Sequence, residues 1–239
     1  YIKILATGSY LPKLEIKNEE LEKEYQLEKG YIEKRTGIKR RFYSQNENIS
    51  YMAIKAVNDL KTNYNFNTNE IDLIIVATTT PDQFMPGISN EIQKELNIEK
   101  CNCIDILAGC NGYITAFDIA SMYIQSGKIE KALIVGVDIL SKYTDKKDIS
   151  TKIILSDGAG ATLIGKSKDK KKYISDIESN PDYKNILACK SNDYITMNGK
   201  EIYKYAVTEP VKSINRLLEN AQENLEDIKY ILPHQSNKK

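Results

Sequence analysis

Tryptophan is absent from this 239-residue chain, and histidine occurs once, at position 234. The four cysteines form no Cys-x-x-Cys pair, so we expect neither a structural zinc site nor a disulfide framework. Basic residues outnumber acidic ones by one, 34 against 33, so the net charge gives no general attraction to nucleic acid or to a membrane. No apolar run reaches the roughly 18 residues of a membrane span.

The first residues, Tyr1-Ile-Lys-Ile-Leu5, do not follow the charged-then-apolar plan of a signal peptide. Together with the cysteine usage, this predicts a reduced, cytoplasmic protein. We expect Cys101 and Cys103 to point to opposite faces of one strand, which would keep their thiols apart.

Strand-like and helix-like apolar patterns alternate along the first part of the chain. Strands are expected at residues 2–6, 71–77, 101–107 and 132–137. Helices are expected from an N-cap at Asn18, over 31–37, 49–60 and 86–96, and from Cys110 to Gly127. Nearly continuous β-branched runs are typical of strands covered on both faces. The pattern therefore predicts a layered α/β domain with a largely parallel sheet.

The later part of the chain has a different pattern. Residues 153–164 are interpreted as two apolar segments joined by a glycine-rich bend at 157–161. A phosphate-binding loop at this bend is disfavoured, because the full glycine motif and a following helix are missing. The lysine-rich stretch 166–172 is a candidate boundary. Beyond it we expect a strand at 173–178, a helix at 202–218 that Pro210 kinks or divides, and a strand from 228 into a polar turn at 233–237.

Cys110 lies where the strand ending near Leu107 runs into a helix. The first turn of a helix has unpaired backbone N–H groups and a positive dipole end, which favour a thiolate, and Gly109 and Gly112 leave room for a substrate. Cys110 is therefore a candidate nucleophile. The alternative is a small buried hydrophobic residue, as free cysteines commonly are.

His234 follows directly after an expected strand, where ligand sites of α/β folds collect. If Cys110 needs an imidazole partner, His234 is the one that this sequence supplies. The alternative is a structural polar residue without a catalytic role.

Six motifs together resemble β-ketoacyl-acyl-carrier-protein synthase III, the priming condensing enzyme of bacterial type II fatty-acid synthesis. They are Thr7-Gly-Ser-Tyr-Leu-Pro12, Arg35-Thr-Gly-Ile38, Val76-Ala-Thr-Thr79, Ala108-Gly-Cys110-Asn-Gly112, Asp157-Gly-Ala-Gly-Ala161 and Pro233-His-Gln-Ser-Asn237. The resemblance covers essentially the whole chain. It implies a thiolase-like αβαβα fold of two similar halves, with the cysteine in residues 1–166 and the histidine in a partial second half at 167–239.

The resemblance also implies the chemistry. Cys110 would take the acyl group of a short acyl-CoA, and malonyl-acyl carrier protein would then lose carbon dioxide and condense with it. His234 and a family asparagine would stabilise the charge on the malonyl thioester oxygen. The backbone N–H of Cys110 would help form the other oxyanion hole. Asn237 would order the turn or a water. No metal or redox cofactor is implied. The family motif that supplies the asparagine is not among these residues.

Substrate contacts follow from the same resemblance. Tyr31 stands where the family has a tryptophan that stacks on adenine, and Ile149 stands where it has the partner arginine, so one cation–π contact is lost. Arg35 is expected at the nucleotide end of CoA. Met85 corresponds to a residue that crosses a homodimer interface to cap the partner's acyl pocket, although ordinary interface packing explains it equally well.

Acyl carrier protein is acidic, so a basic docking patch is expected. The candidates are Lys204, Lys212, Arg216 and Lys239. Lys204, Lys212 and Arg216 lie along one expected helix, and a solvated helix face explains this row of charges equally well.

Two other functions stay open for the whole chain. One is a thiolase-fold acyltransferase of secondary metabolism, and the other is a non-catalytic dimerising paralogue, suggested by Ile149 and by the absent asparagine motif.

Overall fold

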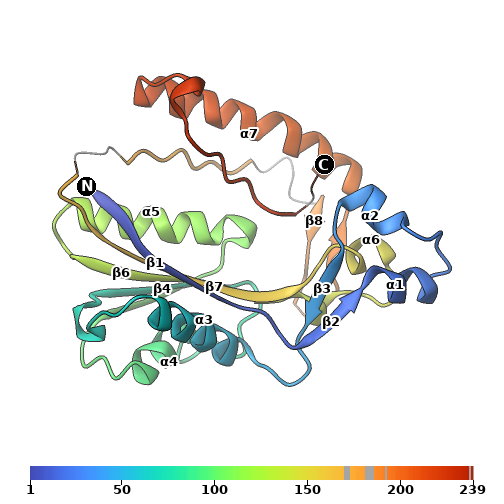
Figure 1. Ribbon diagram of the computed structural model, residues 1–239, viewed down its shortest axis with the longest axis horizontal. Coiled ribbons are helices and arrows are strands. Elements are labelled where there is room, and N and C mark those ends of the chain that lie inside the picture. The colour runs from blue at the N-terminus through green and yellow to red at the C-terminus, as the bar shows by residue number, and fades with distance from the viewer. Residues whose placement is uncertain (170–172, 181–185, 192, 237, 239) are drawn as a thin grey trace. The chain divides into compact units, whose positions relative to one another are not determined.

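The computed structural model describes residues 1–169, 173–180, 186–191, 193–236 and 238 (Figure 1). The chain forms two compact units, each assembled from separate stretches of sequence. The first unit comprises Tyr1–Leu14, Phe42–Leu140 and Ser156–Tyr173. The second comprises Glu15–Arg41, Ser141–Leu155 and Ile174–Lys239. The predicted division into halves at residue 166 stays a prediction.

The first unit is built on a five-stranded sheet with the order β1-β7-β6-β4-β5. Its strands are β1 (Ile2–Tyr10), β4 (Leu73–Ala77), β5 (Asn102–Ile106), β6 (Lys131–Ile139) and β7 (Asp157–Lys166). β4 pairs in parallel with both β5 and β6, whereas β7 pairs antiparallel with β1 and β6. Four strands therefore run in one direction, as expected, and β7 runs against them.

Helices cover both faces of this sheet (Figure 1). α3 (Ile49–Asn63) and α4 (Ile88–Glu95) lie on one face, and α5 (Gly112–Gln125) lies on the other. Successive residues of a strand point to opposite faces, so Ile74 and Val76 of β4 pack with α3, while Leu73 and Ile75 pack with α5. The prediction that β4 is covered on both faces is confirmed, since all five of its residues are buried.

The expected bend at 157–161 is wrong, because these residues form part of one continuous strand, β7. Gly158 and Gly160 pair with β6 on one side, and Ala159–Thr162 pair with Tyr10–Thr7 of β1 on the other. The same pairing extends β1 to Tyr10, beyond the end at residue 6 that the sequence predicts. Hydrogen bonds from two neighbouring strands hold the glycines extended, and no phosphate loop forms there.

Cys101 and Cys103 lie on the same side of the chain, with their Sγ atoms 3.7 Å apart. The expectation of opposite faces is wrong, because a step of two residues along a strand returns to the same face. Both thiols are free, and burial raises the pKa of Cys101 to about 12. These thiols are therefore protonated at neutral pH.

The second unit contains a small core under short helices. These are α1 (Asn18–Glu24), α2 (Tyr31–Thr36) and α6 (Ile149–Lys152), which pack around Leu21, Ile32 and Ile153. Asn18 is not the N-cap of α1, because Lys17 occupies that position. The Asn18 side chain is buried instead. It donates to the Ile38 carbonyl (2.6 Å) and accepts from the Arg41 guanidinium (2.7 Å).

Two small sheets and one long helix are also present in the described chain. β2 (Leu14–Lys17) and β3 (Arg40–Tyr43) form one two-stranded sheet, and β8 (Leu187–Ala188) pairs with β9 (Thr196–Met197) in another. α7 (Gly199–Ala221) confirms the expected helix, extends it at both ends and contains Pro210 in its interior. Within the described ranges, no helix has the length and apolar character needed to cross a bilayer.

Two strands expected in the later part of the chain are not formed. Residues 173–178 and 228–232 have no regular secondary structure. Several apolar side chains of the later segment are exposed, among them Tyr230 at 73% and Leu232 at 92%. An apolar, β-branched pattern specifies a strand only where a neighbouring strand accepts its backbone hydrogen bonds. The sequence pattern alone does not show whether such a neighbouring strand is present.

Gly8 provides a test of the packing between β1 and α3. A Cβ atom at position 8 would lie 2.3 Å from the backbone nitrogen of Leu60 and 2.4 Å from the Ala56 carbonyl oxygen. Because both atoms belong to the helix backbone, they cannot move aside as a side chain could. We expect Gly8→Ala to lower the free energy of unfolding of the first unit by about 3 kcal/mol, measured by urea denaturation.

Gly160→Ala is the matched control, because Gly160 lies in the same sheet and a Cβ there meets no atom within 4 Å. This variant should unfold within about 1 kcal/mol of the unsubstituted protein. Equal stabilities of the two variants would show that α3 does not lie against β1 as described.

Candidate functional site

Cys110 lies in a tight turn between β5 and α5. The turn is the 3-10 segment Gly109–Asn111, and α5 begins at Gly112. Gly109 has φ 58°, in the left-handed region that glycine adopts without strain. Cys110 therefore precedes the α-helix, whereas we expected it in the first helical turn. The residue is exposed, so a substrate can reach its sulfur.

The pKa of the Cys110 thiol is raised above its ordinary value. Atoms packed around the sulfur are the main cause, the negative charge of Asp138 adds to the effect, and a hydrogen bond from the backbone of Cys110 opposes it. The expected stabilisation of a thiolate is therefore wrong for the described chain, because the backbone hydrogen bond does not outweigh desolvation and the carboxylate. A reaction at Cys110 has to begin by removing its proton.

A polar cluster that the sequence analysis missed lies at the ends of β4 and β6. Asp138, near the end of β6, accepts hydrogen bonds from the side chains of Thr78, Thr79 and Thr80, which follow β4. Three consecutive threonines directly after a buried strand were the available signal. The family motif at 76–79 includes two of these threonines, but their partner lies in a strand 60 positions further along, which only the parallel pairing of β4 and β6 brings close.

His234 is exposed and lies in the irregular segment after the 3-10 turn Leu225–Asp227. Beside it, the side chain of Gln235 donates to the Pro233 carbonyl oxygen (3.0 Å). His234 belongs to the second unit and Cys110 to the first. Asn237 and Lys239, which were also candidates, lie outside the described residues.

Tyr31 and Arg35 are brought together on α2, where they are four residues apart and share a helix face. The Arg35 guanidinium carbon lies 4.5 Å from the centre of the Tyr31 ring. Glu22 fixes the start of this helix, since its carboxylate accepts from the backbone N–H groups of Gly30 (2.9 Å) and Ile32 (3.0 Å). The resulting site offers an aromatic ring with a planar cation beside it.

Ile149, at the start of α6, packs against the small core of the second unit. It is therefore held by apolar contacts, and its side chain has no charge to offer a nucleotide.

Met85 lies at an exposed tip of the first unit. Its side chain is 87% exposed, and that of the neighbouring Phe84 is 91% exposed. The tip is tied to α4 by Gln83, whose amide nitrogen donates to the Pro86 carbonyl and to the Glu91 carboxylate, both at 2.9 Å. Two large apolar side chains are thus held in an accessible position.

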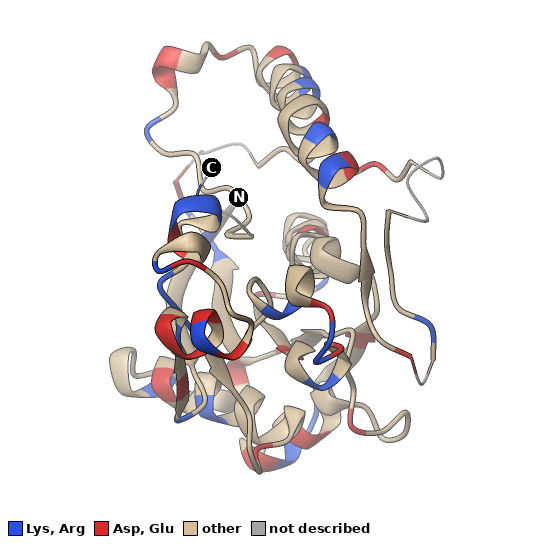
Figure 2. Cartoon of the chain, turned by 90° about the vertical axis from the view of Figure 1, so that its right-hand side faces the viewer, with Lys and Arg blue, Asp and Glu red and all other residues tan. Residues whose placement is uncertain are grey.

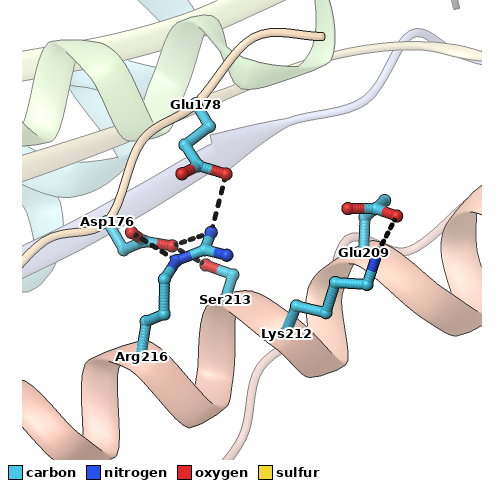
Figure 3. Close-up of polar contacts among 6 residues, drawn as sticks. All are labelled: Asp176, Glu178, Glu209, Lys212, Ser213 and Arg216. Atoms are coloured by element: carbon cyan, nitrogen blue, oxygen red, sulfur yellow. Dashed lines mark hydrogen bonds and ion pairs between the residues drawn. The ribbon is translucent and has the colours of Figure 1, made fainter.

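α7 carries both basic and acidic residues (Figure 2), and two of its basic residues, Lys212 and Arg216, have acidic partners (Figure 3). Arg216 donates to the carboxylates of Asp176 (2.7 and 3.1 Å) and Glu178 (2.8 Å), and Lys212 forms an ion pair with Glu209 (2.7 Å). Hydrogen bonding with Arg216 lowers the pKa of Asp176. The charges of Arg216 and Lys212 are therefore partly compensated within the chain, which the spacing of basic residues could not reveal.

Comparisons with known proteins give one consistent result. The sequence pattern of the family described as 3-oxoacyl-[acyl-carrier-protein] synthase III matches residues 104–192. A β-ketoacyl-[acyl-carrier-protein] synthase III of Clostridium acetobutylicum is 36% identical over 250 residues, which cover 99% of this chain and 77% of the relative.

Solved structures agree. The 3-oxoacyl-[acyl-carrier-protein] synthase III of Aquifex aeolicus VF5 superposes with a TM-score of 0.94 at 36% identity, covering 99% of this chain and 77% of that one. A priming β-ketosynthase from the R1128 polyketide pathway gives a TM-score of 0.89 at 27% identity, covering 99% and 75%. The predicted thiolase-like α/β fold is confirmed by these likenesses. The chain belongs to the β-ketoacyl-[acyl-carrier-protein] synthase III family.

Proposed function

We propose that this protein is an acyltransferase that condenses a short acyl-CoA with malonyl-acyl carrier protein and so initiates fatty-acid synthesis. The observation that carries the proposal is the 36% identity to a β-ketoacyl-[acyl-carrier-protein] synthase III over 99% of the chain. The exposed Cys110 in the turn before α5 supports it, because a covalent acyl intermediate needs an accessible nucleophile.

The first step transfers the acyl group to Cys110. The thiol loses its proton, its sulfur attacks the thioester carbonyl, and the carbon–sulfur bond to CoA breaks. The departing CoA sulfur takes up a proton. The backbone N–H of Cys110 donates to the oxyanion that forms during the attack.

The second step forms the new carbon–carbon bond. Malonyl-acyl carrier protein loses carbon dioxide, and the resulting enolate carbon attacks the carbonyl of the acyl-cysteine. The Cys110 sulfur leaves and is reprotonated, which releases a 3-oxoacyl-acyl carrier protein. His234 donates a hydrogen bond to the enolate oxygen, where negative charge develops. Asn237 has a secondary role in ordering the histidine turn. Neither step requires a metal or a redox cofactor.

The proposed substrate contacts come from the second unit. Tyr31 and Arg35 bind the nucleotide end of CoA, and the observed arrangement of ring and guanidinium supports this role because each has a face on which adenine can stack. Lys204, Lys212, Arg216 and Lys239 attract the acidic carrier protein. Their field is weakened at Lys212 and Arg216 by the ion pairs described above.

We further propose a cytoplasmic homodimer in which Met85 caps the acyl pocket of the partner. β5 lies at the edge of its sheet, and the first unit exposes the apolar side chains of Phe84, Met85, Leu107 and Ile114. A sheet edge beside exposed apolar side chains is typical of a protein–protein interface.

The test is a condensation assay with acetyl-CoA and malonyl-acyl carrier protein, in which 3-oxobutanoyl-acyl carrier protein is detected by mass spectrometry. We expect this product together with a transient acetyl adduct on Cys110. An adduct without the condensation product would favour an acyltransferase with another acceptor, to be identified in an acceptor screen. No adduct from acetyl-CoA, butanoyl-CoA or isobutanoyl-CoA would favour a non-catalytic paralogue.

A further inference from the structure

Asp138 collects four hydrogen bonds on a single carboxylate oxygen. Its Oδ1 accepts from the backbone N–H of Thr79 (2.7 Å) and from the hydroxyls of Thr79 (2.8 Å), Thr80 (3.1 Å) and Thr78 (3.2 Å). β6 continues past the last residue paired with β4, where Gly136 faces Ala77. Asp138, two residues further on, can therefore reach over the end of β4 to the threonines that follow it.

The two flanking hydroxyls are also acceptors, which fixes their orientation. The Thr78 hydroxyl accepts from the backbone N–H of Thr80 (3.1 Å), and the Thr80 hydroxyl accepts from the backbone N–H of Ile139 (2.9 Å). Each hydroxyl has one proton, and it donates that proton to Asp138. Thr78 and Thr80 are 5% and 6% exposed, so the loss of these bonds would leave polar groups unsatisfied away from water.

The end of β4 supports the turn that contains Cys110. The backbone N–H of Thr78 donates to the Ile106 carbonyl at the end of β5 (3.1 Å). Gly112, at the start of α5, lies so close to β4 that a Cβ atom there would be 3.2 Å from Cβ of Ala77. β5, which precedes the cysteine turn, therefore contacts Thr78, and α5, which follows the turn, packs closely on Ala77.

We propose that Asp138 is a positioning residue for the reaction at Cys110, because it gathers Thr78–Thr80, holds the end of β4 beneath the cysteine turn and places its charge beside that turn. The assignment rests on the proposed function, since it gives Cys110 a reaction to perform. Burial of the sulfur raises the pKa of the Cys110 thiol, and the negative charge of Asp138 adds to this effect.

Two substitutions separate the hydrogen-bonding role of Asp138 from its charge. Asp138→Asn keeps an acceptor oxygen for the threonines and removes the charge, whereas Asp138→Ala removes both. Asp72→Asn is the matched control, because Asp72 also accepts from backbone N–H groups, those of Glu130 and Lys131, before the start of β4. Two rates are measured for each variant. These are iodoacetamide alkylation of Cys110 across pH, followed on its peptide by mass spectrometry, and acetylation of Cys110 by acetyl-CoA.

The removal of a negative charge stabilises the thiolate, so Asp138→Asn should shift the alkylation midpoint to lower pH by about half a unit or more. Asp138→Ala should acetylate at least about tenfold more slowly, because the turn loses its support, and Asp138→Asn should recover most of that loss. Asp72→Asn should match the unsubstituted protein in both assays.

An unchanged alkylation midpoint in Asp138→Asn, or acetylation of a folded Asp138→Ala at the unsubstituted rate, would overturn the proposal, and the first of these results does not depend on whether Asp138→Ala folds. A shifted alkylation curve without acetylation of any variant, the unsubstituted protein included, would support the placement of Asp138 and contradict the proposed acyl transfer. The two failures are therefore distinguishable.

Discussion

Cys110→Ala is expected to eliminate acyl transfer, with the rate of acetylation lowered at least about a thousandfold. Alanine removes the sulfur that forms the thioester and keeps the Cβ atom, so we expect the turn Gly109–Asn111 to keep its conformation. The measurement is the intact mass after incubation with acetyl-CoA. The unsubstituted chain should gain one acetyl group, and the variant should gain none.

Cys189→Ala is the matched control. Cys189 is also an exposed free thiol with a raised pKa, but it lies beside β8 rather than in a strand–turn–helix junction. Its loss should leave acetylation unchanged. Acetylation that persists in Cys110→Ala and disappears in Cys189→Ala would assign the adduct to Cys189 and contradict the proposed nucleophile.

His234→Ala is expected to lower condensation by about a hundredfold or more, with acetylation of Cys110 changed by only a few-fold. Removal of one donor to a developing oxyanion has an effect of this size. In the proposed mechanism, the imidazole contacts the malonyl thioester oxygen and plays no part in the first acyl transfer. The two steps are measured separately, as the acetyl adduct on Cys110 and as 3-oxobutanoyl-acyl carrier protein.

Gln235→Ala controls for disturbance of the segment. This substitution removes the contact between the Gln235 amide and the Pro233 carbonyl next to the histidine, and it should leave both steps nearly unchanged. If His234→Ala slowed acetylation as much as condensation, the histidine would instead act on the proton of Cys110. The raised pKa of that thiol makes this a meaningful alternative.

The sequence by itself determined the elements that have a strong internal signal. The buried strand at 71–77 and the helices at 31–37, 49–60 and 202–218 were predicted close to their observed positions, because apolar periodicity and terminal glycines are local features. The family also followed from the sequence, since several motifs in register carry more information than any single one. The same motifs identified the candidate site residues and their order along the chain.

Only the tertiary structure decided what depends on partners distant in the sequence. The glycine-rich stretch at 157–161 became a straight strand because β1 and β6 pair with it on both sides, and 173–178 and 228–232 did not become strands in the described chain. Backbone hydrogen bonds between strands are non-local, so a local pattern cannot predict whether they form.

Electrostatic surroundings depended on tertiary structure in the same way. The sequence suggested a thiolate at Cys110, whereas packing around the sulfur and the charge of Asp138 raise the pKa of the thiol. It suggested Arg216 as part of a basic docking patch or of a solvated helix face, whereas Asp176 and Glu178 bind that guanidinium. The sequence identified which residues carry the chemistry. Their protonation and effective charge were decided by burial and by neighbours that only the folded chain brings close, because both effects depend on distance in space.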